Sequence, residues 1–301
     1  MTDTKKVLLA GASGVLGHHI ADALRRHGYT VLALGRGAEA DITADIMNRD
    51  QLLRALEGQR IDTVIHAATA LAKAPMKHRD MYATNALRIT GTANLVEAAK
   101  LVGARRMIAE SMVFGYGYRD FGDHVIAESD RYGADGDKAV APHLEGMRVK
   151  EELMLGTPGI EGISLRYGLF YGAGGTENLV GMLRKRRLPA VNDHGRVLPW
   201  VNLADAGAAA ALAVEGGTPG AAYNIVDDSP LGFGAHVRLL AEAFRTPAPF
   251  TAPRWLLRPM SYIHTVTGVS MRVTNAKAKA ELGWKPRYPA CADGVRALVQ
   301  A

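Results

Sequence analysis

The N-terminal segment most constrains the fold of this chain, because an apolar strand-like run there passes directly into a glycine-rich turn. The run Val7–Ala10 is followed by three glycines at G-x-x-G-x-x-G spacing, Gly11, Gly14 and Gly17, and a helical pattern then begins. Glycine permits a tight turn and the close approach of a phosphate to backbone N–H groups, and a helix N-terminus adds partial positive charge. The segment therefore predicts a strand–turn–helix unit that holds a pyrophosphate.

Strand-like and helix-like patterns alternate through the first half of the chain. Strands are expected at Lys6–Ala10, Thr30–Leu34, Thr63–His66, Arg106–Ala109 and Gly162–Arg166, and helices at Gly14–His27, Gln51–Glu57, Met76–Lys100 and Pro142–Leu155. A glycine close behind each helix is the usual stop signal. Alternation with nearly continuous apolar strands predicts an α/β fold, a doubly wound parallel Rossmann sheet covered by helices on both faces. Ligands of such sheets bind beyond the carboxyl ends of the strands, where the strand order reverses.

The regular alternation loosens after Arg166. Loops rich in Gly and Pro separate shorter elements at 172–175, 189–199 and 216–220. We expect residues 1–166 to form a dinucleotide-binding Rossmann domain. Residues 167–301 are expected to form mainly a substrate-binding lobe, with some elements returning to the sheet. The aromatic stretch Trp255–Val269 lies where a substrate pocket would be assembled.

Charge and cysteine content narrow the classes of partner. The formal net charge is +6, and the basic cluster Arg184–Arg187 precedes Pro189. The simplest interpretation of this cluster is a solvated helix end, and the second is attraction of an anionic cofactor or substrate. Nucleic-acid binding ranks last, because no aromatic residues are interleaved with the basic ones. The single cysteine, Cys291, excludes an intrachain disulfide framework and fits a reducing compartment. We expect a cytoplasmic monomer or homodimer with a small-molecule substrate, no signal peptide, no membrane span and no metal.

Seven motifs follow one another along nearly the whole chain. They are Gly11–Gly17, Asp62–Ala68, Asn85 with Gly91–Leu95, Leu165–Gly172, Val201–Asp205, Tyr223–Ile225 and Asn275–Pro286. Together they resemble the extended short-chain dehydrogenases/reductases, the NAD-dependent epimerase/dehydratase-like group. The resemblance implies that the cofactor contacts Gly11, Ser13, Gly14, Val15, Leu16, Gly17, Asp45, Ile46, Ala67, Ala68 and Asn85. Asp45 and Ile46 would flank the adenine.

The end of the second strand indicates which cofactor is used. In NAD-using members of the resembled family an acidic residue there accepts the ribose hydroxyls, whereas this strand ends in Gly35-Arg36. An aspartate would repel the additional phosphate of NADP, and an arginine offers it a charge-assisted fork. We therefore expect NADP (NADPH), held by Arg36, over the alternative of an ordinary surface arginine. His66 either passes under the cofactor with Ala67 and Ala68 or is a satisfied strand-end histidine.

The catalytic pair usual for this family is missing. Its members place a lysine four residues after a tyrosine on one helix face, where the ammonium lowers the phenol pKa. None of the ten tyrosines here has a lysine at that position. With Glu151–Leu153 as the register mark, His143 stands at the tyrosine position and Met147 at the lysine position, and a register shifted by one is no better. Lys150 lies seven residues from His143, about 10 Å along the axis, too far to replace the lysine directly.

Four arrangements would compensate for the missing pair. His143 acts as general acid, or is merely a solvent-facing histidine at a helix start. Ser111, which matches the family's active-site serine, donates to the substrate carbonyl, or only satisfies backbone at its strand end. Tyr116 or Tyr118 swings in from the following loop. Alternatively, a substrate hydroxyl beside the ketone polarises it, and no protein acid is required.

A ketone reductase agrees best with an intact cofactor motif and a missing catalytic pair. Nucleotide-sugar epimerases and dehydratases begin with deprotonation by the tyrosine, so its loss harms them more than it harms a reduction. Members without the pair that reduce aromatic polyketide intermediates in antibiotic tailoring are the nearest functional resemblance. We therefore expect an NADPH-dependent reductase of a hydrophobic aromatic ketone. The alternatives are a nucleotide-sugar epimerase or dehydratase with a relocated base, and a non-catalytic NADP-binding regulator.

Overall fold

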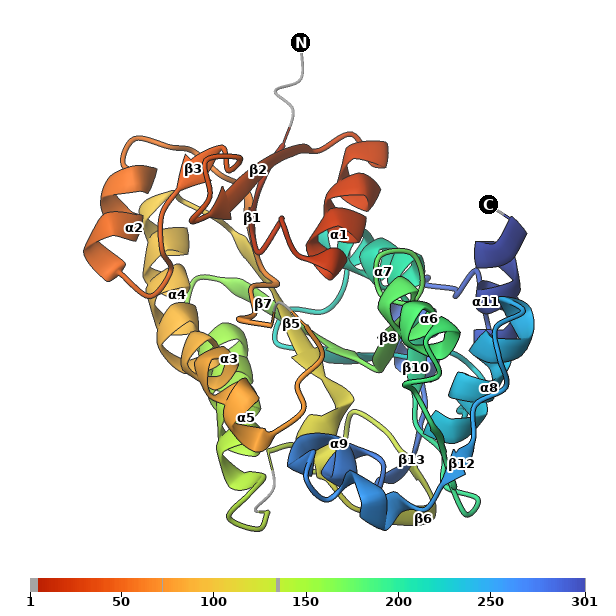
Figure 1. Ribbon diagram of the computed structural model, residues 1–301. Coiled ribbons are helices and arrows are strands. Elements are labelled where there is room, and N and C mark those ends of the chain that lie inside the picture. The colour runs from red at the N-terminus through yellow and green to blue at the C-terminus, as the bar shows by residue number, and fades with distance from the viewer. Residues whose placement is uncertain (1–4, 72, 134–135, 301) are drawn as a thin grey trace.

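The computed structural model describes residues 5–71, 73–133 and 136–300, and a parallel sheet of seven strands forms its centre (Figure 1). The strands are β1 (Lys6–Ala10), β2 (Thr30–Gly35), β3 (Ile42–Thr43), β4 (Thr63–His66), β5 (Arg106–Met112), β7 (Glu161–Tyr167) and β11 (Ala222–Ile225). Their order is β11-β7-β5-β4-β1-β2-β3, and every neighbouring pair is parallel. The order reverses between β1 and β4, which places the expected ligand edge at the carboxyl ends of these strands. The predicted doubly wound sheet is confirmed.

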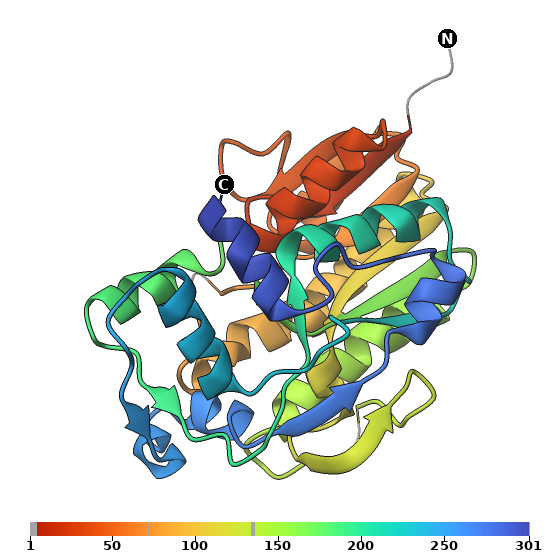
Figure 2. The same ribbon diagram turned by 90° about the vertical axis from the view of Figure 1, so that its right-hand side faces the viewer.

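Helices cover both faces of this sheet. They are α1 (Val15–Arg26) and α7 (Leu203–Glu215) on one face, and α2 (Arg49–Leu56), α4 (Thr92–Leu101) and α5 (Ala141–Gly156) on the other. Figure 2 shows α1 and α7 side by side across the sheet. Alternate residues of one strand serve the two layers: Val7 and Leu9 pack with α1 and α7, whereas Leu8 and Ala10 pack with α2 and α4. Burial on both faces explains why these strands are almost continuously apolar.

The single helix expected over Met76–Lys100 is divided in the structure. A 3₁₀ turn (His78–Met81) leads into α3 (Tyr82–Ala86), a π-helical turn (Leu87–Gly91) and then α4. The apolar spacing continues across the π turn, so periodicity alone did not predict it. Such turns interrupt α-helices frequently at functional sites.

The remaining elements are short and pack around a second apolar core that includes Phe114, Trp200 and Tyr262. Three parallel strand pairs contribute: β8 (Leu169–Tyr171) with β10 (Trp200–Asn202), β9 (Ala190–Val191) with β12 (Thr251–Ala252), and β6 (Asp120–Ile126) with β13 (Ser270–Val273). The helices are α6 (Glu177–Arg184), α8 (Phe233–Ala243), α9 (Ser261–Val266), α10 (Ala276–Glu281) and α11 (Cys291–Gln300), with 3₁₀ turns at Val113–Tyr116 and Arg254–Leu257.

Several boundaries bear on the site. β1 and β4 have the predicted bounds, whereas β5 continues three residues beyond the predicted Ala109, so Ser111 lies inside the strand. The basic cluster Arg184–Arg187 is exposed where α6 ends, which is the solvated helix end favoured from the sequence. Within residues 5–71, 73–133 and 136–300, no helix is long and apolar enough to cross a membrane.

Candidate active site

The turn between β1 and α1 has the geometry of a phosphate cradle. Gly11 has a φ of +93°, and a Cβ there would lie 2.7 Å from backbone atoms of Ala67 and Ala68. A Cβ at Gly17 would lie 2.1 Å from the carbonyl oxygen of Gly11. Gly14 caps α1 without a side-chain hydrogen bond, so no cap side chain satisfies the first N–H groups of the helix. The backbone is therefore arranged to receive a pyrophosphate at the N-terminus of α1.

Other residues predicted to hold the cofactor surround this turn. Ser13 and Val15 are exposed and Leu16 is half-buried. A Cβ at Gly174 would lie 3.1 Å from Val15, so the loop after β8 contacts the start of α1. Arg36 follows β2 directly and is exposed. It is therefore free to meet a phosphate at the end of this strand.

The remaining predicted cofactor residues divide between the cradle and the interior. Ala67 and Ala68 continue from β4 beneath Gly11, and Asp45 is half-buried with its Oδ1 accepting the N–H of Met47 at 2.9 Å. Ile46 is buried against Gly91, where a Cβ would approach its Cδ1 to 3.0 Å. The side chain of Asn85 instead contacts His143 at 2.9 Å. Asn85 thus belongs to the side-chain cluster around α5 in this structure.

The position on α5 expected for the lysine is occupied by Met147, which carries no charge and is 1% exposed. Lys150 is fully buried and donates to Glu110 Oε2 at 3.1 Å and to the carbonyl oxygen of His66 at 3.2 Å. Burial lowers the pKa of Lys150, and the neighbouring Glu110 opposes that change. The ammonium is thus committed to two partners at the end of β4 and β5.

His143 is fully buried, unlike the solvent-facing histidine considered from the sequence. Its Nε2 lies 2.9 Å from Nδ1 of His78 and its Nδ1 lies 2.9 Å from Nδ2 of Asn85. His78 Nε2 in turn lies 3.2 Å from Oγ1 of Thr265 on α9. Burial first, then His78 and Arg88, lower the pKa of His143 to about 4. The imidazole is therefore neutral near pH 7 and both of its nitrogens have partners.

Ser111 forms a hydroxyl pair with Tyr132. The Ser111 Oγ lies 2.6 Å from the Tyr132 hydroxyl, which donates to the carbonyl oxygen of Met112 at 2.8 Å. Since the single Tyr132 proton goes to Met112, the Ser111 hydroxyl donates to Tyr132 in this arrangement. The Tyr132 ring covers Gly115, where a Cβ would lie 2.0 Å from ring atoms, and faces the Arg166 guanidinium at 3.8 Å. Burial raises the pKa of Tyr132 well above its usual value, so the phenol stays protonated.

The two tyrosines considered as mobile donors have partners elsewhere. The Tyr116 hydroxyl donates to Asn224 Oδ1 at 2.8 Å and accepts from Arg166 at 2.7 Å, and burial raises its pKa to about 12. Arg166 also forms a two-pronged ion pair with Glu151. The Tyr118 hydroxyl lies 3.3 Å from that of Tyr262. Neither tyrosine is hydrogen-bonded to Ser111.

The side chains around His143 and Ser111 form a polar cluster beside α5. Three of its members were not predicted from the sequence: His78, Arg88 and Tyr132. Tyr132 lies in the loop before α5, and no local spacing connects it with Ser111. His78 meets His143 only through the fold. Arg88 had a signal, since it is the single charged residue between Asp80 and Glu97.

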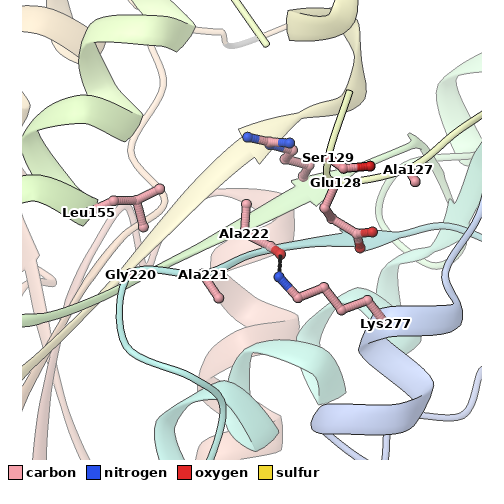
Figure 3. Close-up of a pocket in the computed structure, with 9 residues that line it drawn as sticks. Ala127, Glu128, Ser129, Leu155, Gly220, Ala221, Ala222 and Lys277 are labelled. Atoms are coloured by element: carbon pink, nitrogen blue, oxygen red, sulfur yellow. Dashed lines mark hydrogen bonds between the residues drawn. The ribbon is translucent and has the colours of Figure 1, made fainter. Parts of the chain in front are cut away.

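A cavity of about 490 Å³ lies at the free edge of β11 (Figure 3), and Arg166, which also contacts Tyr116 and Tyr132, is one of the residues that line it. Lys277 there donates to the carbonyl oxygen of Ala222 at 3.1 Å, and Glu128 accepts the N–H of Asn224 at 2.8 Å. These side chains cover the unpaired backbone groups of an edge strand. The cavity therefore marks the protected sheet edge. Among the described residues, no group of three or more His, Cys, Asp or Glu residues is arranged to hold a metal ion.

Comparison with known proteins identifies the family. Residues 7–225 match the model of the NAD dependent epimerase/dehydratase family. The chain belongs to this family. A 3-diazoavenalumate denitrifying reductase of a Streptomyces species is 34% identical, with 96% of this chain and 99% of the relative covered. A 3 beta-hydroxysteroid dehydrogenase/Delta 5-->4-isomerase of Mycobacterium tuberculosis is 24% identical, with 95% and 88% covered.

Solved structures of other proteins share the fold. A human epimerase family protein with NADPH has a TM-score of 0.80 at 15% identity, covering 98% of this chain and 99% of that one. The UDP-glucose 4-epimerase of Thermus thermophilus with NAD has a TM-score of 0.76 at 23% identity, covering 98% of each chain. The extended short-chain dehydrogenase/reductase resemblance is confirmed, and this family member is an NAD(P)-dependent oxidoreductase.

Proposed function

We propose that this oxidoreductase is an NADPH-dependent reductase of a hydrophobic aromatic substrate, working without a tyrosine–lysine pair. The observation that carries the proposal is the state of α5, where a neutral, fully bonded His143 and a buried, uncharged Met147 occupy the positions of the pair. An epimerase or dehydratase needs a base to take the proton of an alcohol, whereas a ketone reduction needs no base: the hydride forms the C–H bond, and the resulting alkoxide takes one proton from solvent or from a neighbouring substrate hydroxyl. When bound, the cofactor supplies a hydride.

The choice of NADPH rests on Arg36. Its guanidinium is exposed directly after β2, where the additional phosphate of NADP would lie in a sheet of this kind. A guanidinium binds a phosphate through two parallel charge-assisted hydrogen bonds.

The aromatic nature of the substrate is inferred from the rings near the carboxyl end of β5. Tyr118, Tyr262, His143 and His78 contact one another, with ring centroids 5.2 to 6.2 Å apart. A further ring, that of Tyr132, lies against Ser111. A planar aromatic substrate gains stacking and edge contacts from such walls, and a sugar gains less. In Figure 1, β5 points toward α9, which carries Tyr262.

An aromatic ketone of the polyketide type is the first acceptor that we propose. In this proposal the Ser111 hydroxyl turns from Tyr132 toward the carbonyl oxygen, and the protonated Tyr132 supports it. Donation to the oxygen strengthens as negative charge develops there, so the pair stabilises the transition state more than the ground state. A hydroxyl beside the ketone would assist in the same way.

An aromatic diazo compound is a second candidate, favoured by the 34% identity to the denitrifying reductase. In its diazonium form such a group is replaced by one hydride at the ring carbon and leaves as dinitrogen. This replacement of dinitrogen by hydride consumes no proton, which agrees with a site that lacks an acid–base pair. The buried Arg88 guanidinium, two of whose nitrogens have no hydrogen-bond partner, favours a neutral ketone over a diazonium cation.

Oxidation of NADPH measured with three substrate sets tests the proposal: aromatic ketones with and without a neighbouring hydroxyl, arenediazonium salts, and UDP-glucose. Mass spectrometry distinguishes an alcohol product from an arene formed with loss of dinitrogen. We expect turnover with one of the first two sets. Turnover of UDP-glucose alone would establish an epimerase, and cofactor binding without turnover in any set would establish a regulator.

A further inference from the structure

Arg88 is a buried cation without a partner in the described part of the chain. The residue is 4% exposed, and its Nε and Nη1 atoms are buried without a hydrogen-bond partner. A guanidinium remains protonated throughout the physiological pH range, and an uncompensated buried charge is strongly unfavourable. Its backbone is fixed in the π-helical turn, where its carbonyl oxygen accepts from Thr92 Oγ1 at 2.6 Å. The side chain is therefore arranged for an acceptor that the described residues do not supply.

The buried carboxylates of Glu110 and Glu151 are already paired with other cations. Glu110 accepts from Lys150 at 3.1 Å, and Glu151 accepts from Arg166 at 2.6 Å. Both ion pairs are almost fully buried. Arg88 has no hydrogen bond to Glu110, but its charge acts there: Lys150 and Arg88 both lower the pKa of Glu110 against the opposing effect of burial. The described part of the site holds one surplus positive charge.

The charge of Arg88 acts on tyrosines that we expect to contact substrate. Burial raises the pKa of Tyr118 and Tyr262, and the Arg88 charge is near enough to offset part of that rise. It acts in the same way on Tyr132, the partner of Ser111. These tyrosines come from the segment after β5 and from α9. The Arg88 charge therefore reaches three of the tyrosine rings that we expect to contact substrate.

We infer that Arg88 binds a carboxylate carried by the aromatic substrate. A carboxylate offers two planar acceptor oxygens to a guanidinium and cancels the surplus charge. The cofactor phosphates are expected elsewhere, at α1 and Arg36, so they do not meet this need. The inference rests on the proposed function, because it takes the tyrosine rings on which the Arg88 charge acts as the substrate walls.

Binding to the NADP⁺-loaded protein, in which no NADPH is consumed, tests this inference. Benzoate, cinnamate and 2-naphthoate are each titrated by calorimetry beside their methyl esters. We expect at least one acid to bind wild-type protein about 10- to 150-fold more tightly than its ester, the range of one charge-assisted hydrogen bond. Arg88→Met should remove that preference and leave the affinities for NADP⁺ and the ester unchanged. Arg79→Gln, which changes an exposed arginine on the neighbouring turn, should keep the preference.

Thermal unfolding without ligands gives a second readout. Because the Arg88 charge has no partner among the described residues, Arg88→Met should unfold at the wild-type temperature or above it. A clearly lower temperature, a loss of NADP⁺ affinity, or acids that bind wild type no better than their esters would overturn the inference. Preserved preference for an acid in a protein that oxidises no NADPH would support this site and contradict the proposed reductase.

Discussion

The phosphate cradle at Gly11–Gly17 and the polar cluster around His143 on α5 depend on the sequence in different ways, although both lie at the carboxyl edge of one sheet. In the cradle, backbone geometry requires the residue types, since a Cβ at Gly11 or Gly17 would collide with main-chain atoms. Around α5, side chains from distant segments set the chemistry, as in the contacts of His143 with His78 and Asn85. Backbone needs are visible in a sequence motif, whereas a polar cluster can be rebuilt from other residues without altering the fold. Family membership therefore fixes the cofactor-binding architecture more firmly than the proton chemistry.

Among the substitutions considered, we expect the largest change in stability when the family's lysine is restored at position 147. Met147→Lys places a charge at a position that is 1% exposed, in a site with a surplus cation. We expect a loss of about 3–5 kcal/mol in the free energy of unfolding, measured in urea, and no gain in turnover. Met147→Leu is the control, with a loss below about 1.5 kcal/mol. A stable Met147→Lys variant with faster turnover would contradict this account, because a cation at the lysine position would then still assist the reaction.

Arg36→Ala tests which cofactor the phosphate-cradle region prefers. We expect NADPH binding to weaken by about 1.5–3 kcal/mol, because one charge-assisted fork to phosphate is lost, with NADH binding nearly unchanged. Fluorescence titration of both cofactors measures the two affinities. Equal losses for both, or a wild-type preference for NADH, would remove the proposed choice of NADPH.

Ser111→Ala tests the hydroxyl pair. The activation barrier should rise by about 1–3 kcal/mol, so that kcat falls by a larger factor than KM rises. The reason is that donation to the carbonyl oxygen is strongest in the transition state. Tyr132→Phe is the matched variant, since it keeps the ring on Gly115 and Arg166 while removing the hydroxyl. A substrate that polarises its own ketone gives the smaller loss, and methylation of its neighbouring hydroxyl then costs more than Ser111→Ala. Unchanged kinetics for Ser111→Ala on both substrates would exclude Ser111 from the reaction.

The fold was largely predictable because its strands are buried on both faces and its turns need glycine. The bounds of β1 and β4 and the strand–turn–helix at Gly11–Gly17 followed from local pattern alone. The π-helical turn was not predictable, since apolar spacing runs through it. Tyr132 and His78 were missed because their contacts with Ser111 and His143 join segments far apart in the chain. The burial of Arg88 depends on packing that no window of sequence contains.

The turnover of His143→Phe tests most directly the central claim that the protein supplies no proton from α5. The pKa of His143 is lowered to about 4 by burial, His78 and Arg88, so the imidazole is already neutral above about pH 5.5. On the substrate identified by the NADPH screen, we expect kcat to fall less than about tenfold, with no titration from this residue between about pH 5.5 and 8. A loss of about a hundredfold or more with NADPH affinity intact would contradict the account and make His143 the general acid.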